Sequence, residues 1–251
     1  MTYAAKALAA ARAYGLDIPA EVDEADQLQH AVHAAANTNP PEPPGLPTRA
    51  RDLAPVLTAH GEDVRAHHAA QQAAITMRTP ADQRLTHAVR DAVPAWINHL
   101  SRDYDTTIKQ FASKARGVPD EAHEDRLAHL NPKQFGDWQT ARKHAHTLDT
   151  IVRVRDTLAR AAGEGGTQDK ALFVAARLPD PPDDPSNWPD IAAHITTWRD
   201  RRADPVQRWA ALTASPLTLT LAPVGAPLER AQAREQWRDN YINRNKPKRR
   251  K

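Results

Sequence analysis

Nine apolar residues in the middle of the chain are spaced by three or four positions, and this spacing constrains the fold more than any other feature. They are Leu85, Val89, Val93, Trp96, Leu100, Tyr104, Ile108, Phe111 and Ala115. Because an α-helix turns once in 3.6 residues, they share one helix face. Thr79 before Pro80 predicts the helix start, and Gly117 predicts its end. The helix should span about 37 residues, or about 55 Å, with a kink at Pro94.

Two further long helices are predicted on either side of this one. The sequence Asn131-Pro132-Lys133-Gln134 has the form of a capping box and begins an apolar stripe that ends at Gly163. A weaker stripe covers residues 49–77, where Gly61 interrupts it. Three long helices with short connections predict an all-α protein, an elongated antiparallel helical bundle or hairpin with smaller flanking helices. None keeps a strict seven-residue apolar repeat, so a simple coiled-coil dimer is not expected.

Two proline clusters divide the chain, because consecutive prolines cannot continue a helix. They predict a linker over 40–48, expected to be polyproline-like, and a Pro/Asp-rich linker over 179–186. The remaining parts are an N-terminal helical segment 1–39, the long-helix bundle 49–178, a tryptophan-containing helical segment 187–243 and a basic tail 244–251. Shorter helices are predicted over 2–14, 19–36 and 227–242, with further helix starts at Asn187 and Asp204.

One run looks like a β-strand. Leu217, Leu219 and Leu221 alternate with threonines, as in a half-buried strand. A single strand cannot form a sheet within its own chain, so this run is expected to pair with another chain or to lie extended.

The composition favours helix and an intracellular setting. Alanine, the best helix former, accounts for 47 of the 251 residues, and there is no cysteine. Disulfides and thiolate metal sites are therefore excluded. The N-terminus lacks an apolar run of signal-peptide strength, and no stretch approaches the ~18–20 apolar residues of a membrane span. We expect a cytoplasmic protein that does not contact membrane.

The positive charge is concentrated at the C-terminus. Six of the 34 basic residues lie in the last eight positions of the chain. Without these six, 28 basic residues stand against 31 acidic ones, so the rest of the chain has a net charge of −3. The tail should be disordered when free, and its cations are candidate nucleic-acid-binding residues that contact the phosphate backbone without sequence preference. An acidic protein surface, or no specific partner, are the alternatives. The six residues are Arg244, Lys246, Lys248, Arg249, Arg250 and Lys251.

No arrangement typical of an enzyme or a metal site stands out. Of the close histidine pairs, only His30 and His33 have helical spacing, and two ligands are too few for zinc, so we interpret them as solvent-facing. The chain's four serines lack a nucleophile elbow, and the glycines after residue 162 are interpreted as a helix end rather than a phosphate loop. No catalytic residue, cofactor or metal is predicted.

A basic face on the helix that follows Asn131 is a weaker candidate. It would comprise Arg142, Lys143, Arg153 and Arg155, interrupted by Asp149 and Asp156. A solvated face is the first interpretation and a phosphate-binding face the second.

Taken together, these features favour a non-enzymatic structural or interaction protein. It would assemble with itself or with a larger complex, for which a bacterial virus or mobile element is the expected setting. The alternative is a nucleic-acid-associated protein that binds through its tail.

Overall fold

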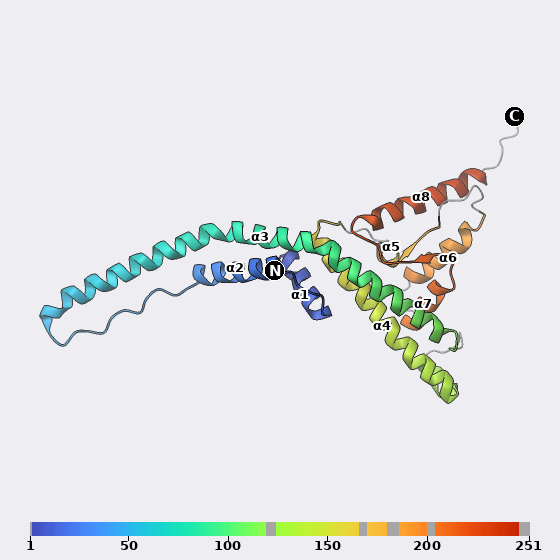
Figure 1. Cartoon of the computed structure of the whole chain (residues 1–251), viewed down its shortest axis with the longest axis horizontal. Helices are drawn as coiled ribbons and strands as arrows, with labels where there is room; N and C mark the ends of the chain where they lie inside the picture. Colours follow the sequence, from blue (N-terminus) through green and yellow to red (C-terminus); the bar gives the residue numbers. More distant parts are fainter. Residues whose placement is uncertain (1, 119–123, 166–169, 180–185, 200–203, 246–251) are drawn as a thin grey trace.

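A computed structural model of the whole chain describes every residue except 1, 119–123, 166–169, 180–185, 200–203 and 246–251 (Figure 1). The described part contains eight α-helices, two 3-10 helices and two very short strands. In chain order they are α1 (Tyr3–Tyr14), α2 (Ala20–Ala36), η1 (Ala50–Asp52), α3 (Leu53–Ala115), η2 (Glu124–His129), α4 (Pro132–Ala161), α5 (Lys170–Ala175), β1 (Ala176–Arg177), α6 (Trp188–Arg199), α7 (Pro205–Thr213), β2 (Thr218–Leu219) and α8 (Ala226–Arg244).

The architecture is an antiparallel helical hairpin to which smaller helices are added. α3 and α4 run side by side in opposite directions, and α2 lies antiparallel along the middle of α3 (Figure 1). The helices α5 to α8 form a second layer at the end where α3 meets α4. The indole of Trp96 in α3 donates a hydrogen bond to the carbonyl of Asp17 at 2.7 Å, which fixes the turn between α1 and α2. The predicted elongated all-α fold is confirmed.

α3 differs from the prediction because it is one continuous helix of 63 residues. The expected boundary at Thr79-Pro80 is wrong, since both Pro80 and Pro94 lie inside the helix. Tertiary contacts explain this outcome. Arg78, just before the boundary, donates to Asn37 at 2.7 Å, and Asp82, just after it, accepts from Gln29 at 2.7 Å. α2 therefore holds the two halves on one axis, and this packing outweighs the local preference of proline.

Several predicted helix ends are confirmed by their capping geometry. Gly15 ends α1 with a left-handed φ of 86°, a conformation that glycine adopts without steric cost. Asn131 and Gln134 form the complete reciprocal capping box of α4. The side chain of Asp204 accepts a hydrogen bond from the backbone N–H of Val206 at 2.7 Å and so caps the start of α7. These local signals identify helix ends because each satisfies backbone groups that the helix itself leaves without partners.

The strand prediction is corrected by pairing within the chain. β2 pairs antiparallel with β1, and Ala176 lies opposite Leu219. The pairing extends by hydrogen bonds from Thr220 to the carbonyl of Ala175 and from Ala222 to that of Val174. The run at 217–221 therefore needs no second chain. Its partner β1 follows the six-residue helix α5, a helix that the sequence pattern does not predict.

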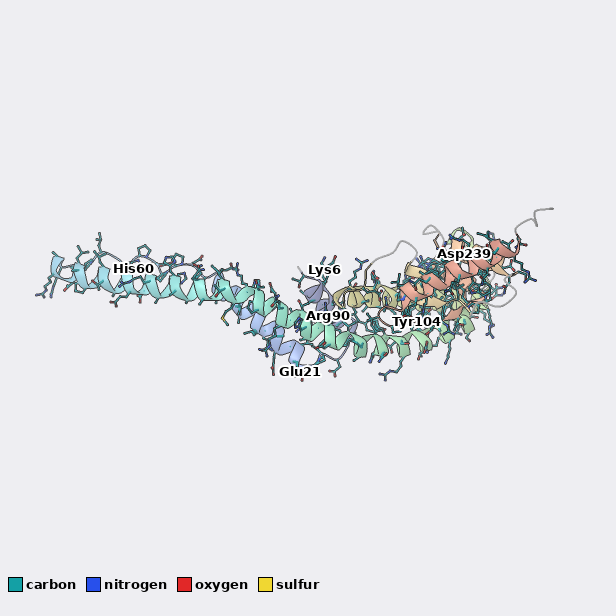
Figure 2. All side chains as sticks on the ribbon, turned by 90° about the horizontal axis from the view of Figure 1, so that it is seen from above. Lys6, Glu21, His60, Arg90, Tyr104 and Asp239 are labelled. Carbon is teal, nitrogen blue, oxygen red and sulfur yellow. The ribbon has the colours of Figure 1, made fainter. Side chains whose placement is uncertain are left out.

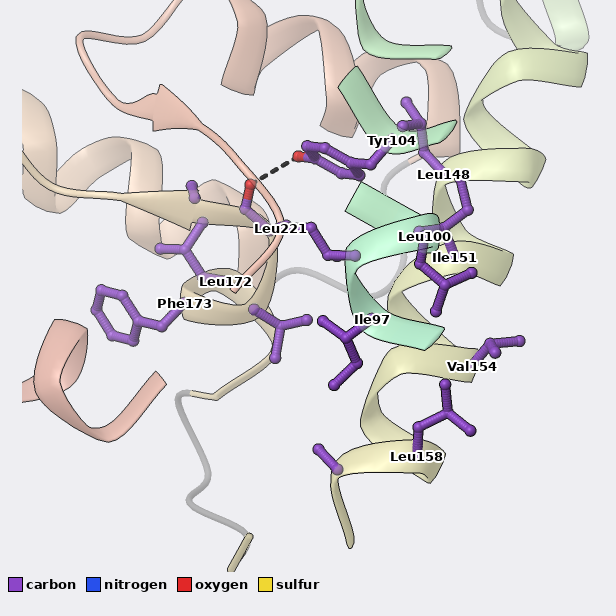
Figure 3. Close-up of a cluster of buried hydrophobic side chains, with 14 of the residues drawn as sticks. Ile97, Leu100, Tyr104, Leu148, Ile151, Val154, Leu158, Leu172, Phe173 and Leu221 are labelled. Atoms are coloured by element: carbon purple, nitrogen blue, oxygen red, sulfur yellow. Dashed lines mark hydrogen bonds between the residues drawn. The ribbon is translucent and has the colours of Figure 1, made fainter. Parts of the chain in front are cut away.

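Buried side chains from α1 to α8 form one cluster, and Figure 3 shows the part of it that lies between α3, α4 and α5. Leu100 of α3 and Leu148 of α4 are fully buried there. Tyr104 donates its hydroxyl to the carbonyl of Ala175 at 2.6 Å, the dashed line in Figure 3. This hydrogen bond ties the hairpin to the C-terminal layer.

Candidate interaction surface

The N-terminal third of α3 projects beyond α2, the helix that lies along the middle of α3. α2 ends at Ala36, where the side chain of Gln71 donates to the carbonyls of Ala36 at 3.4 Å and Thr38 at 3.3 Å. α3 begins 18 positions before Gln71. We call residues 53–73 the arm, which is about 31 Å long at the helical rise. Figure 1 shows it extending from the body, with the proline-rich segment running back towards its tip.

No residue of the arm is buried, and the first buried residue of α3 is Ala74. Leu57 is 56% exposed and Leu53 is 39% exposed. Ile75 and Met77, just beyond the arm, are also exposed. Figure 2 shows His60 on the arm, well away from the body that carries Tyr104 and Asp239. The arm therefore has no buried face, although residues on one side of it, among them His60, Val64 and His67, are half-buried.

One face of the arm continues the stripe that forms the core further along α3. Its positions alternate in steps of four and three and reach Ala74, Ala81 and Leu85 without a break. We call the part on the arm the arm seam. Polar side chains occupy half of it, which is why the apolar residues alone do not keep a seven-residue repeat. The arm seam consists of Leu53, Leu57, His60, Val64, His67 and Gln71.

Charge on the arm is low. Its ionised side chains at neutral pH are Glu62, Asp63 and Arg65, a net charge of −1 with histidines neutral. Arg65 donates to the carbonyl of Gly61 within the same helix at 3.2 Å. The rings of His67 and His68 meet edge to face, with 5.7 Å between centroids, and His67 Nε2 is buried without a hydrogen-bond partner among the described residues. A weakly charged helix surface of this kind suits contact with another helix better than contact with a polyanion.

The predicted nucleic-acid-binding tail is described only at its first residue. Arg244 is the last residue of α8 and is exposed. Lys246, Lys248, Arg249, Arg250 and Lys251 lie outside the described residues. Binding through the tail stays a prediction.

The histidine pair lies in a cleft between α1, α2 and α3. His33 Nε2 is 3.1 Å from Asp82, and His30 Nδ1 is 2.8 Å from the carbonyl of Asp26. Arg12 pairs with Asp26 at 2.8 Å. Hydrogen bonds, chiefly from a glutamine and then from His33, lower the pKa of Asp82. The histidines are partly exposed, as predicted, but each also has a partner. Within the described ranges, no group of three or more His, Asp or Glu side chains could hold a metal ion.

The basic face of α4 is smaller than predicted. Arg155 is fully buried and pairs with Glu164 through two hydrogen bonds of 2.7 and 2.8 Å. It also donates to the carbonyls of Ala222 and Pro223. Arg155 therefore does not belong to a solvated or phosphate-binding face. Its position within the apolar stripe of α4, four residues after Ile151, is the signal in the sequence that could have indicated burial.

The loop after α4 also has a role that the sequence did not suggest. Gly163 adopts a left-handed φ of 89°, and Glu164 donates its backbone N–H to the carbonyl of Ala159, so the glycine ends the helix as predicted. The Glu164 side chain then accepts from the backbone of Gly225 at 2.9 Å, besides binding Arg155. This glutamate anchors the start of α8 to the end of α4.

Comparison with known proteins finds no matching family model, no matching curated protein and no matching solved structure. Among the described helices, none combines the length and apolar character needed to cross a lipid bilayer. The function must therefore be argued from the surfaces of the molecule.

Proposed function

We propose that the protein is a non-enzymatic helical assembly protein and that its arm binds the arm of a second copy. The observation that carries this proposal is the absence of any buried residue over 53–73 of a 63-residue helix. Helical stability in proteins comes mostly from packing of one face rather than from intrinsic propensity. A helical segment of this length with no buried side chain is what a partner helix would stabilise.

The arm seam supports pairing with a second copy. Steps of four and three place side chains so that those of a second helix fit between them. An antiparallel pair aligned over the whole arm seam would place Leu53 of one copy opposite Gln71 of the other, and His60 opposite Val64. A parallel pair would instead stack His60 and His67 on their own copies. The low net charge of the arm allows two copies to approach. Because the antiparallel arrangement does not stack the histidines on their own copies, it is the one we propose.

The mass of the protein in solution tests this proposal. Light scattering coupled to gel filtration should give twice the chain mass of 27.7 kDa for the native protein. Replacing Leu57 and Val64 by glutamine should return the protein to a monomer. Ala59 and Ala66 have the same seven-residue spacing but lie on the exposed face away from the arm seam, so glutamine at both provides a matched control that stays dimeric.

A native protein that is monomeric at all concentrations would overturn the proposal. Equal loss of association in the control pair would also overturn it, since the effect would then not depend on the arm seam. Because the chain has no cysteine, single cysteines carrying nitroxide labels can report the distance between arms. A label at position 59, which lies off the arm seam, should give an intermolecular distance, and its absence in the L57Q/V64Q background would confirm that the arms are in contact.

Association with nucleic acid through the tail remains the alternative. It rests on the six basic residues of the last eight, against a body of net charge −3. Deleting residues 244–251 should then abolish binding to generic DNA, and binding by the native chain should fall steeply with salt. Binding that survives the deletion would exclude the tail as its cause.

A further inference from the structure

The proline-rich segment that joins α2 to the tip of the arm does not pack into the core. We call residues 39–49 the strap, and Figure 1 shows it running from the end of α2 to the start of α3. None of its side chains is buried, and within the described part of the chain its residues 39–48 make no backbone–backbone hydrogen bond. Each proline fixes its own φ at about −65°, and the residue before a proline is held in an extended conformation. The strap is therefore extended before any partner arrives.

One edge of the strap is exposed along its whole length. A polyproline helix has three residues per turn, so residues three positions apart lie along the same edge. The two half-buried residues of the strap, Pro41 and Pro47, are six positions apart and so lie on one partly covered edge. A neighbouring edge has no covered residue, and we call it the strap edge. It consists of Pro40, Pro43, Leu46 and Arg49.

Leu46 is the most exposed large apolar side chain in the described part of the protein. It is 94% exposed, and the next in order, Tyr3, is 63% exposed. Full burial of a leucine side chain contributes about 1.5–3 kcal/mol, and nothing in the isolated chain provides that burial. An apolar pocket on a partner would provide it.

The strap edge ends in an unpaired cation. Arg49 is exposed, and among the described residues its guanidinium has no ion pair and no hydrogen bond. The nearest acid in the sequence, Asp52, lies 3.9 Å from the side chain of Arg51 instead. The strap edge is therefore apolar over its first three members and positive at its C-terminal end.

We propose that the strap edge binds a partner protein through an aromatic-lined groove of the SH3 type, bordered by an acidic side chain. Proline-rich segments suit such grooves because they are already extended and lose little conformational entropy on binding. Pro43 and Leu46 occupy the apolar part of the groove, and the acidic side chain pairs with Arg49. This ion pair fixes the direction in which the strap lies. The proposal does not rest on pairing of the arms, since each chain carries its own strap.

The strap is longer than the path it covers, which leaves room for a partner. At about 3.1 Å per residue, the 12 steps from Thr38 to Ala50 reach about 37 Å. The carbonyl of Thr38 accepts from Gln71, and the 18 positions from Gln71 back to Leu53 span about 27 Å of helix. With about 10 Å to spare, the strap can move away from the arm while α2 and α3 stay folded.

Calorimetric titration of the full chain with a purified SH3 domain tests the proposal. The domain chosen is one that binds Pro-x-x-Pro peptides followed by an arginine, a form that residues 44–49 share. The native chain should bind it saturably, with one domain per chain. Leu46→Ala and Arg49→Gln should each weaken binding about tenfold or more, as truncation of an interface anchor does. Both side chains are exposed, so circular dichroism should show an unchanged fold.

Matched variants outside the strap provide the controls. Met77→Ala removes another exposed apolar side chain, and Arg51→Gln removes the same charge two positions beyond Arg49. Both should bind the domain as the native chain does. No binding by the native chain, or equal weakening by Arg51→Gln and Arg49→Gln, would overturn the proposal. Pairing of the arms is measured separately by light scattering, so either proposal can fail without the other.

Discussion

Replacing Glu164 by glutamine should destabilise the protein strongly, because it leaves a buried arginine without its counter-ion. Arg155 is 0% exposed and the Glu164 side chain only 7% exposed. Two hydrogen bonds of 2.7 and 2.8 Å join them. Removing one partner of a buried ion pair typically costs about 3–5 kcal/mol. Glutamine keeps one acceptor oxygen, and two backbone carbonyls still bind the guanidinium, so we expect about 3 kcal/mol.

Urea denaturation followed by far-ultraviolet circular dichroism measures this loss. Glu164→Gln should lower the midpoint without changing the slope, because the surface exposed on unfolding stays the same. Hydrogen exchange should also increase at Gly225, whose N–H donates to Glu164. Glu62→Gln removes the same charge from the exposed arm and should change stability by no more than about 0.5 kcal/mol. An equally small effect of Glu164→Gln would refute the reasoning that this pair holds the C-terminal layer.

Four further substitutions have outcomes that the structure determines. Tyr104→Phe removes the hydroxyl that donates to the carbonyl of Ala175. It should lower the free energy of unfolding, measured by urea denaturation, by about 1–2 kcal/mol. Gly15→Ala places a side chain at a φ of 86° and should cost about 1 kcal/mol, whereas Gly61→Ala, inside α3, should be stabilising. Asp82 has a lowered pKa, so its contribution to stability is present above the ordinary value of 3.8 and is lost as the pH falls through the lowered one. Asp82→Asn should therefore weaken the dependence of stability on pH below about 4, and an unchanged acid profile would contradict this.

Much of the fold could be predicted from local pattern. The apolar stripes of α3 and α4 identified the two helices that form the hairpin, and Gly15, Asn131 and Asp204 marked helix ends. These helices and helix ends can be predicted from sequence because side-chain periodicity and capping depend only on neighbours within a turn or two. The candidate interaction surface was harder to predict from the sequence. The exposure of the arm cannot be inferred from spacing alone.

The sequence by itself determined that this chain is helical, where most of its helices end and which face of each helix is apolar. Only the tertiary structure decided that α3 passes through Pro80, since α2 bridges that position. Tertiary structure also decided that Arg155 is buried, because Glu164 reaches it from a loop, and that the 217–221 run finds a strand within its own chain. The physical reason is the same in each case. A local preference amounts to about 1–3 kcal/mol, and contacts between segments distant in sequence can outweigh it.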